Sequence, residues 1–321
     1  YLVYQANKDS HNIFLRKIVN LIVGNEGTVA TNVQDFGMPS IIKDKDDRLW
    51  IAYQAYIGGK YSIHITSSTD DGQVWASSSQ LSATSTTYGG YRPALTLYND
   101  YPACIYYYDR LAWALRYYDG NSWSVERDVA PYAWVSSTLF SVVSSGSIPN
   151  QHLQAVFNAN DNIYHYRYDG ATWSTSVNIS KGYWPRLTYD GQNVWCFWSK
   201  KEGTNSYNIL YSKFAGTTWG TPTQLTYDGL NHKYITCADM SKNYLPLAWT
   251  EGSNAPYRVR FDKIVLPPEG DTTPPVISNV IIASVSDTAV VISYLTDELA
   301  DSQIEYGLTP SYGSITSLNQ V

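Results

Sequence analysis

A short turn that ends in a tryptophan recurs along the chain at intervals of about fifty residues. Its tryptophans, which are 48, 50 and 46 residues apart, are Trp75, Trp123, Trp173 and Trp219. A fixed period of roughly 40 to 50 residues is typical of the four-stranded blades of a β-propeller. The repeat therefore predicts an all-β protein in which each copy of the turn belongs to one blade.

The residues before each tryptophan suit a tight turn. Asp and Gly precede it in three copies, and the fourth has lost the aspartate; the residues concerned are Asp70, Gly72, Trp75, Asp119, Trp123, Asp169, Trp173 and Trp219. The aspartate can accept hydrogen bonds from backbone N–H groups further along, and glycine supplies a positive φ. The tryptophan then has a large ring to bury between neighbouring blades. These residues are predicted to be structural.

The first copy, residues 67–75, resembles the Asp-box of the bacterial neuraminidase repeat (BNR) family, whose pattern is roughly Ser-x-Asp-x-Gly-x-x-Trp. Ser68, Asp70, Gly72 and Trp75 fit that spacing. Later copies depart from it, with Tyr117 and Arg167 in place of the serine. The resemblance covers about residues 1–267 and implies a sialidase-like propeller. It says little about activity, because the same box occurs in enzymes and in non-catalytic binding propellers.

Alternating apolar and polar residues between turn residues predict strands throughout. They group into six units, of which the two terminal ones are incomplete and the first lacks its opening strand. Six blades are expected, or seven if further sequence precedes Tyr1. The propeller is assigned to residues 1–267 and a Pro-rich linker to 268–275. Residues 276–321 resemble a fibronectin type III-like β-sandwich module, here incomplete because such a sandwich needs about 100 residues.

Composition and net charge limit the classes of partner that this protein is expected to bind. The net charge is −6, and no large cluster of Lys and Arg exists, which argues against nucleic acid. No apolar stretch approaches the roughly 18 residues of a membrane helix, so no membrane insertion is expected in this segment. Abundant Tyr (29) and Trp (11) with only 16% charged residues favour an extracellular or cell-surface protein. No cofactor is expected, and no metal either, since the acidic turn 44–47 lacks the glycine and distal glutamate of a calcium loop.

The loops that lead into the innermost strand of each blade share an aromatic residue. Aromatic faces stack on the C–H surfaces of sugars, and tyrosine adds a hydroxyl group. The simpler alternative is that these rings pack between blades. We expect some of them to bind carbohydrate on one face of the propeller, together with neighbouring basic residues; the candidate ligand-binding residues are Tyr88, Tyr91, Arg92, Trp134, Tyr183, Trp184, Arg186 and His232.

Two other functions stay open. The family's sialidases clamp a carboxylate with three arginines, and a third inner-strand arginine is missing here, which argues against that activity. A polysaccharide lyase or glycoside hydrolase would need a base and a basic partner; its candidate catalytic residues are His232, Tyr234, Arg92 and Tyr183. An architectural subunit of a surface lattice or filament is the other alternative. The favoured prediction is a non-catalytic binding module whose partner is a glycan or another surface protein, with self-assembly as a further option.

Overall fold

The structure is a computed structural model, and its described residues form strands and turns without a helix. They are residues 1–6, 11–19, 22–31, 33, 37–82, 90–108, 112–129, 140–203, 206–228, 230–237, 244–252, 257–266, 275–297, 300–309 and 312–317. None of them forms a helix of the length and apolarity that crossing a membrane requires. Contacts divide the chain into two units, Tyr1–Met240 with Pro246–Asp262, and Ser241–Leu245 with Lys263–Val321.

Among the described residues, six antiparallel sheets form the larger unit, apart from residues 244–245 and 263–265 of the sixth sheet, and each sheet is a meander of consecutive strands. The first three sheets contain β1 (Leu2–Ala6), β2 (Asn12–Val19) and β3 (Ile22–Ala30); β4 (Ser40–Lys43), β5 (Leu49–Ile57), β6 (Lys60–Ser68) and β7 (Ser79–Gln80); and β8 (Gly90–Tyr98), β9 (Tyr101–Tyr108), β10 (Ala112–Tyr117) and β11 (Arg127–Asp128). The other three contain β12 (Phe140–Ser145), β13 (His152–Ala159), β14 (Asn162–Tyr168) and β15 (Val177–Lys181); β16 (Tyr183–Tyr189), β17 (Val194–Glu202), β18 (Ser206–Phe214) and β19 (Thr223–Gln224); and β20 (His232–Cys237), β21 (Tyr244–Glu251) and β22 (Arg258–Val265).

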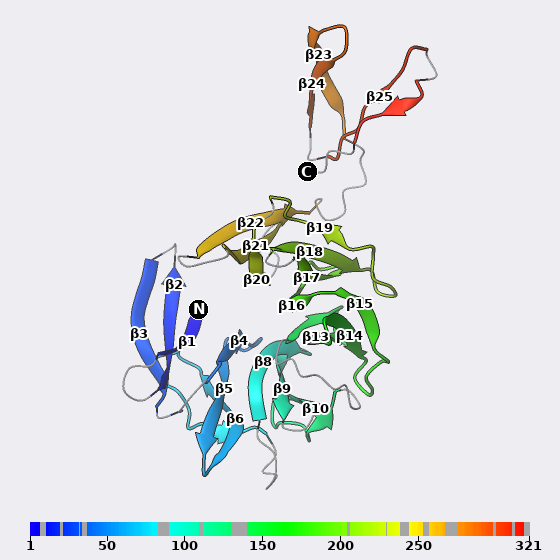
Figure 1. The fold of residues 1–321 in the computed structure, drawn as a ribbon. Coiled ribbons are helices and arrows are strands. Elements are labelled where there is room, and N and C mark those ends of the chain that lie inside the picture. Colours follow the sequence, from blue (N-terminus) through cyan, green and yellow to red (C-terminus); the bar gives the residue numbers. More distant parts are fainter. Residues whose placement is uncertain are drawn as a thin grey trace. The chain divides into compact units, whose positions relative to one another are not determined.

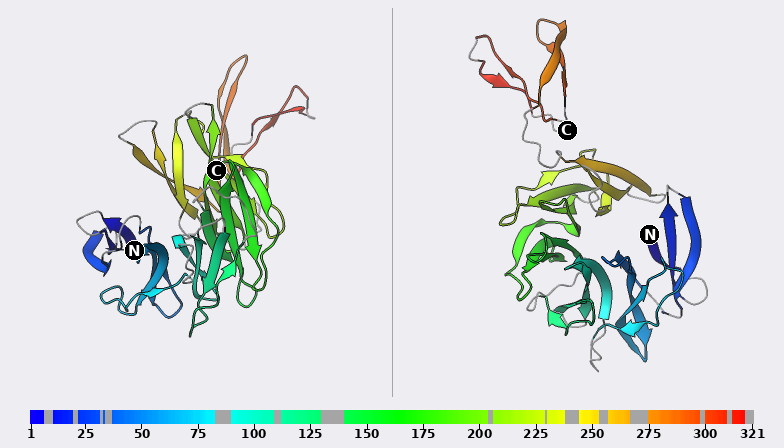
Figure 2. Two further views of the ribbon diagram at one scale, coloured as in Figure 1. Left: turned by 60° about the horizontal axis from the view of Figure 1, so that its bottom comes forward. Right: turned by 180° about the vertical axis from the view of Figure 1, so that it is seen from behind.

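The six sheets are arranged in a ring, with β4, β8, β16 and β20 toward its centre (Figure 1). The same ring is seen from behind in Figure 2. The sequence prediction of an all-β, six-bladed β-propeller is therefore confirmed. Because every complete sheet follows the same strand order, equivalent residues of successive repeats meet on the same face of the ring.

Among the described residues, the first sheet has three strands and no innermost strand, as expected from its sequence. In the second, third and fifth sheets, the residue after the fourth strand donates its N–H to the third strand, as Leu81 does to the Ile63 carbonyl at 2.7 Å. Val33 makes this bond to the His11 carbonyl at 3.3 Å, and His11 precedes β2. It follows that β1, β2 and β3 correspond to the second, third and fourth strands of the other sheets.

Apolar clusters fill the boundaries between sheets, and each repeated tryptophan belongs to one of them. Trp75 packs between the first and second sheets, Trp123 between the second and third, Trp173 between the third and fourth, and Trp219 between the fourth and fifth. The Trp123 ring lies against Trp50 and the Trp219 ring against His165, both in the preceding sheet. Each turn therefore links its own blade to the one before it.

The first turn differs in detail from the later ones. Asp70 Oδ1 accepts the N–H groups of Gln73 and Val74 at 3.1 and 2.9 Å, while Ser68 Oγ donates to the same carboxylate at 2.6 Å. Asp119 instead accepts the N–H groups two and three residues on, and Asp169 does the same. Gly72 has a φ of 88°, and a Cβ there would lie 2.5 Å from Leu15 of the first sheet. Only glycine therefore fits this turn without displacing the neighbouring blade.

Described by itself, the smaller unit contains two short hairpins beyond residue 275. One pairs β23 (Ile277–Val285) with β24 (Val290–Thr296), and the other pairs β25 (Glu305–Tyr306) with β26 (Ser314–Ile315). Most side chains of both hairpins are exposed, including apolar ones such as Ile281 and Val291. The described part of this unit is therefore two β-hairpins and does not form a complete β-sandwich.

Candidate functional site

A β-bulge recurs near the start of three innermost strands. The pairing register shifts between Tyr91 and Ala94 in β8, between Tyr183 and Arg186 in β16, and between Lys233 and Thr236 in β20. Within each bulge one large residue has a positive φ, with values of 52° for Arg92, 54° for Trp184 and 55° for Tyr234. Left-handed backbone is costly for such residues, and bulges redirect side chains near binding sites. The predicted loops therefore share a local geometry as well as an aromatic residue.

The bulges meet the preceding sheet through one repeated contact. When the third strands are aligned on Ile63, Ile163 and Ile209, Tyr61 in β6, Tyr207 in β18 and Asp161, in the turn just before β14, occupy equivalent positions. Each lies against the first residue of the next sheet's bulge. Tyr61 contacts Tyr91 with ring centroids 5.1 Å apart, Asp161 accepts a hydrogen bond from Tyr183, and Tyr207 lies under the Lys233 ammonium, which is 4.5 Å from its ring centroid.

Aromatic side chains gather at the bulges of β16 and β20 in a group that we call the Trp184 cluster and define as Tyr183, Trp184, Tyr207 and Tyr234. Trp184 is central, with ring centroids 4.6 Å from Tyr234, 5.4 Å from Tyr207 and 5.7 Å from Tyr183. Lys233 also lies over the Trp184 ring, at 5.9 Å. Tyr234 is 58% exposed, and the other three rings are partly exposed. The cluster thus offers several ring surfaces with an ammonium group beside them.

Charge at the edge of the cluster acts on Tyr183. Its hydrogen bond to the Asp161 carboxylate, helped by some burial, raises the pKa of Tyr183 to about 12. The phenol therefore stays protonated at neutral pH and donates to Asp161. Tyr183 is therefore an uncharged hydrogen-bond donor at this edge of the cluster.

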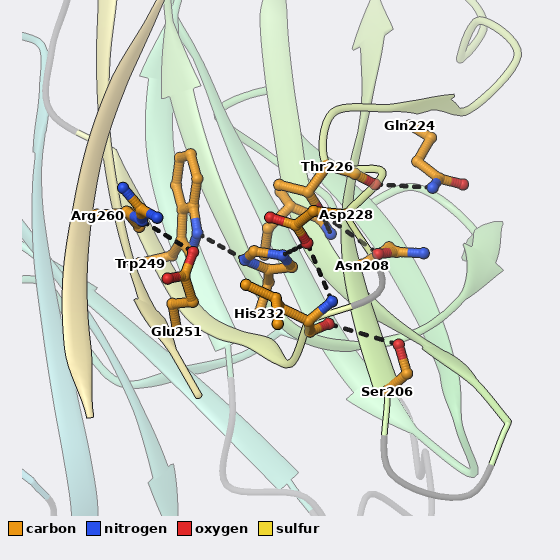
Figure 3. Close-up of polar contacts among 11 residues, drawn as sticks. Ser206, Asn208, Gln224, Thr226, Asp228, His232, Trp249, Glu251 and Arg260 are labelled. Atoms are coloured by element: carbon orange, nitrogen blue, oxygen red, sulfur yellow. Dashed lines mark hydrogen bonds and ion pairs between the residues drawn. The ribbon is translucent and has the colours of Figure 1, made fainter. Parts of the chain in front are cut away.

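His232 lies in the same sheet as Tyr234 but inside the protein. It is 1% exposed, and both ring nitrogens are engaged (Figure 3). Trp249 Nε1–H donates to His232 Nδ1 at 2.9 Å, and His232 Nε2 lies 2.6 Å from Asp228 Oδ1. Because an indole N–H can only donate, Nδ1 must be the acceptor and the proton must be on Nε2. The buried imidazole is therefore a link between Trp249 and Asp228 in this structure.

Asp228, His232 and Glu251 bring their ligand atoms within 4.8 Å of one another, a spacing that could hold a metal ion. Their hydrogen bonds do not suit one. A metal on His232 Nε2 would put the ring proton on Nδ1, directly opposite the Trp249 N–H group. Glu251 Oε2 already accepts from Arg260 Nε at 2.8 Å. We assign this group as a hydrogen-bonded network that fixes the start of β20.

The two predicted arginines, Arg92 and Arg186, are not equivalent: when β8 and β16 are aligned on their bulges, the two residues are two positions apart. Arg92 is the left-handed residue of its bulge, whereas Arg186 is the residue after its bulge. Arg186 Nη1 donates to the carbonyl groups of Phe140 and Pro185, each at 3.2 Å, and burial lowers the pKa of its guanidinium. Burial also lowers the pKa of Arg92. The two guanidinium groups therefore do not form a matched pair for one carboxylate.

The predicted residues fall at different places around the ring. Tyr183, Trp184 and Tyr234 come together, while Tyr91 and Arg92 belong to the third sheet. Tyr88 and Trp134 lie outside the described residues. The sequence analysis missed Tyr207, which belongs to the cluster, and Lys233, whose ammonium group lies over two of its rings. It also missed Tyr61. Aligning the third strands on Ile63 and Ile209 would have revealed Tyr61 and Tyr207 as equivalent.

Comparison with known proteins supports the fold. No protein-family model matches the chain, and no curated protein sequence does. Among solved structures, a protein of unknown function from Dyadobacter fermentans is 13% identical with a TM-score of 0.57, over 81% of this chain and 85% of the other. The K499G mutant of NanB sialidase from Streptococcus pneumoniae is 9% identical with a TM-score of 0.56, over 81% of this chain and 63% of the other. At such identities the likeness concerns the fold alone.

Proposed function

We propose that this protein is an extracellular or cell-surface propeller that binds carbohydrate on the Trp184 cluster without catalysing a reaction. The observation that carries the proposal is the mutual contact of Trp184 with Tyr183, Tyr207 and Tyr234, at the bulges of β16 and β20. Ring faces can cover the apolar side of a sugar, while phenol hydroxyls and the Lys233 ammonium can donate to its oxygens. Packing alone does not account for the exposure of Tyr234.

The enzymatic alternative has less support. Its proposed base, His232, is buried and hydrogen bonded through both nitrogens, so it is poorly suited to take a substrate proton. Its proposed partner Arg92 is in the third sheet, three sheets from β20. A base and a basic partner that act on one bond must both reach it. We therefore favour binding over catalysis.

The finer family assignments are also proposals. We infer that the first turn is an Asp-box, because Ser68, Asp70 and Gly72 form the local hydrogen bonds that the motif's residue types allow. We assign residues 1–267 to the propeller, 268–275 to the linker and 276–321 to a fibronectin type III-like module. The hairpin of β23 and β24 supports a β-rich module there. An extracellular location accords with its many tyrosines and few charges.

The test is binding to soluble polysaccharides, namely xylan, galactan, cellulose derivatives, polygalacturonate and alginate, measured by affinity electrophoresis and calorimetry. The wild type should bind at least one of them. The double variant Trp184→Ala/Tyr207→Ala should bind it at least roughly 30-fold more weakly, which corresponds to the loss of about 2 kcal/mol typical of a central aromatic contact.

Tyr306→Ala is the matched control, because Tyr306 is an aromatic residue of β25 that is 54% exposed and does not belong to the cluster. It should bind as the wild type does. Circular dichroism must show that the double variant is folded; Tyr234→Ala, which alters an exposed ring, serves as the second variant. Unchanged affinity in both cluster variants, or no binding to any of the polysaccharides by the wild type, would refute the proposal.

One observation favours an architectural role as the second candidate. β22 ends the strand order of its sheet among the described residues. Three exposed apolar side chains alternate along its first half and the residue before it: Tyr257, Val259 and Phe261. Edge strands with such a surface pair readily with other chains. If the protein assembles through this edge, light scattering should show oligomers that Val259→Lys disperses. A monomer at all concentrations would exclude this role for the edge.

A further inference from the structure

A second row of aromatic rings lies at the boundary between the second and third sheets. We call it the Tyr61 row and define it as Tyr56, Tyr61, Tyr91 and Tyr107. Successive ring centroids are 4.8 Å apart for Tyr56 and Tyr61, 5.1 Å for Tyr61 and Tyr91, and 6.1 Å for Tyr91 and Tyr107. Tyr56 is exposed, and the other three are partly exposed. The row is therefore a continuous surface of phenol rings that extends outward from the protein.

We propose that the Tyr61 row is a second carbohydrate subsite and that one polysaccharide chain engages both it and the Trp184 cluster. The proposal rests on the proposed function of the Trp184 cluster. Its own support is that residues of the row occupy positions of the repeat equivalent to those at the cluster: Tyr61 corresponds to Tyr207, and Tyr91 corresponds to Lys233. Equivalent positions of the repeat lie on the same face of the ring.

The two groups lie on opposite sides of the ring axis. One is at the boundary of the second and third sheets and the other at the boundary of the fifth and sixth, which are three steps apart in a ring of six (Figure 1). A ligand that touches both must extend across the face, as a polysaccharide can and a disaccharide cannot. The chain length of the ligand therefore distinguishes one subsite from two.

The chemistry of the Tyr61 row suits a sugar chain. Its rings provide apolar faces, and its hydroxyl groups can both donate and accept hydrogen bonds. The hairpin beside it turns through Gly58 and Gly59, and a Cβ built at either would have open space within 4 Å. The tip of the hairpin is thus narrow and leaves the outer rings Tyr56 and Tyr61 accessible from that side.

Linking two weak subsites through one ligand strengthens binding without any new contact. Once the chain is held at one subsite, the other meets it at a high effective concentration. We therefore expect the intact polymer to bind more tightly than its short oligosaccharides, per chain, by at least roughly tenfold. Loss of either subsite should remove that advantage.

The experiment uses the full chain and whichever of the five polysaccharides named above binds the wild type most tightly, both as intact polymer and as its disaccharide and trisaccharide. Calorimetry is performed on the wild type, Tyr61→Ala/Tyr91→Ala, Trp184→Ala/Tyr207→Ala and the control Tyr306→Ala. Each double variant should lose the roughly tenfold advantage of the polymer. Each should also retain oligosaccharide binding at the intact subsite, while Tyr306→Ala behaves as the wild type.

Tyr56→Ala is the second variant if the double variant of the row is unstable, because Tyr56 is exposed at its outer end. It should weaken polymer binding and leave oligosaccharide binding at the Trp184 cluster unchanged. Polymer affinity that is unchanged in every variant of the row would overturn the second subsite while leaving the proposed function intact. Absence of all binding by the wild type would overturn both.

Discussion

The Trp184 cluster and the Tyr61 row lie at equivalent positions of the repeat, but they differ in how their last rings contact the protein core. Tyr107, at one end of the Tyr61 row, lies 5.3 Å from Trp113, which is 1% exposed and packs on Phe140 and Phe157 in the core. The Trp184 cluster instead ends at Tyr234, which is exposed. One aromatic surface is therefore continuous with the packing between blades, and the other stands largely outside it.

The two surfaces also differ in charge. At the station where the Tyr61 row has Tyr91, the Trp184 cluster has Lys233, and Asp161 contacts Tyr183 on its other side. The Tyr61 row consists of phenols alone. Arg92 follows Tyr91 in the same bulge without belonging to the row. Equivalent positions of the repeat thus carry a phenol in one place and an ammonium group in another.

The largest expected effect comes from truncating a tryptophan associated with each surface. Trp113→Ala should lower the free energy of unfolding by about 3–5 kcal/mol, because it leaves a cavity in the core cluster. Trp184→Ala should cost much less, since its ring is partly exposed. Chemical denaturation with urea measures both values. Equal losses would show that the Trp184 cluster is as much a part of the core as the inner end of the Tyr61 row.

Exchanging the residues at the equivalent positions 91 and 233 should have a smaller effect, on ligand affinity. Lys233→Tyr removes an ammonium group that lies over two rings, and Tyr91→Lys introduces one at the equivalent place. If the ligand is anionic, Lys233→Tyr should weaken binding by roughly two- to fivefold, the size of a cation–π or exposed charge contribution of about 0.5–1 kcal/mol.

The same two substitutions, Lys233→Tyr and Tyr91→Lys, should also change how binding depends on salt concentration. Binding through the Trp184 cluster should weaken as ionic strength rises, and Lys233→Tyr should remove most of that dependence. Tyr91→Lys should add salt dependence to binding of the polymer. Calorimetry across a salt series with polygalacturonate, and with xylan as the uncharged control, measures this. Identical salt responses in all three proteins would mean that Lys233 does not contact the ligand.

The smallest effect concerns Tyr183. Its pKa of about 12 lies above the usual value near 10, so the contribution of its protonated form to stability is complete below pH 10 and is lost as the pH rises through 12. Asp161→Asn should return the pKa toward 10. Titration of ¹³Cζ-labelled tyrosine by NMR measures the shift. A Tyr183 titration unaltered in this variant would show that another group holds the phenol proton.

The ring itself could be predicted from sequence because four tryptophans repeat at a nearly constant spacing. The absence of an opening strand in the first unit was also visible, since residues 2–6 already read as the second strand of a blade. The later turns were grouped with the first, yet Asp119 and Asp169 bind the backbone one residue closer than Asp70 does. The sequence already contains that shortening, because Asp70 lies five residues before its tryptophan, whereas Asp119 and Asp169 lie four residues before theirs.

The site was only partly predictable. Aromatic residues in the loops before the innermost strands identified Tyr183 and Trp184, but Tyr207 comes from a third strand and joins them only through tertiary contact. His232 was a candidate base in the sequence as a lone histidine in a loop. In the structure it is the first residue of β20 and is 1% exposed, with the Trp249 indole donating to its ring.

The positive φ of Arg92, Trp184 and Tyr234 has a consequence for how such a protein can change. Each bulge sets its outward residue apart from the alternation that buries its neighbours, so these three positions can vary in size and charge while the blade interior keeps its sequence. The backbone there already tolerates an arginine, a tryptophan and a tyrosine. A library restricted to these three codons would therefore sample new ligand preferences on an unchanged scaffold.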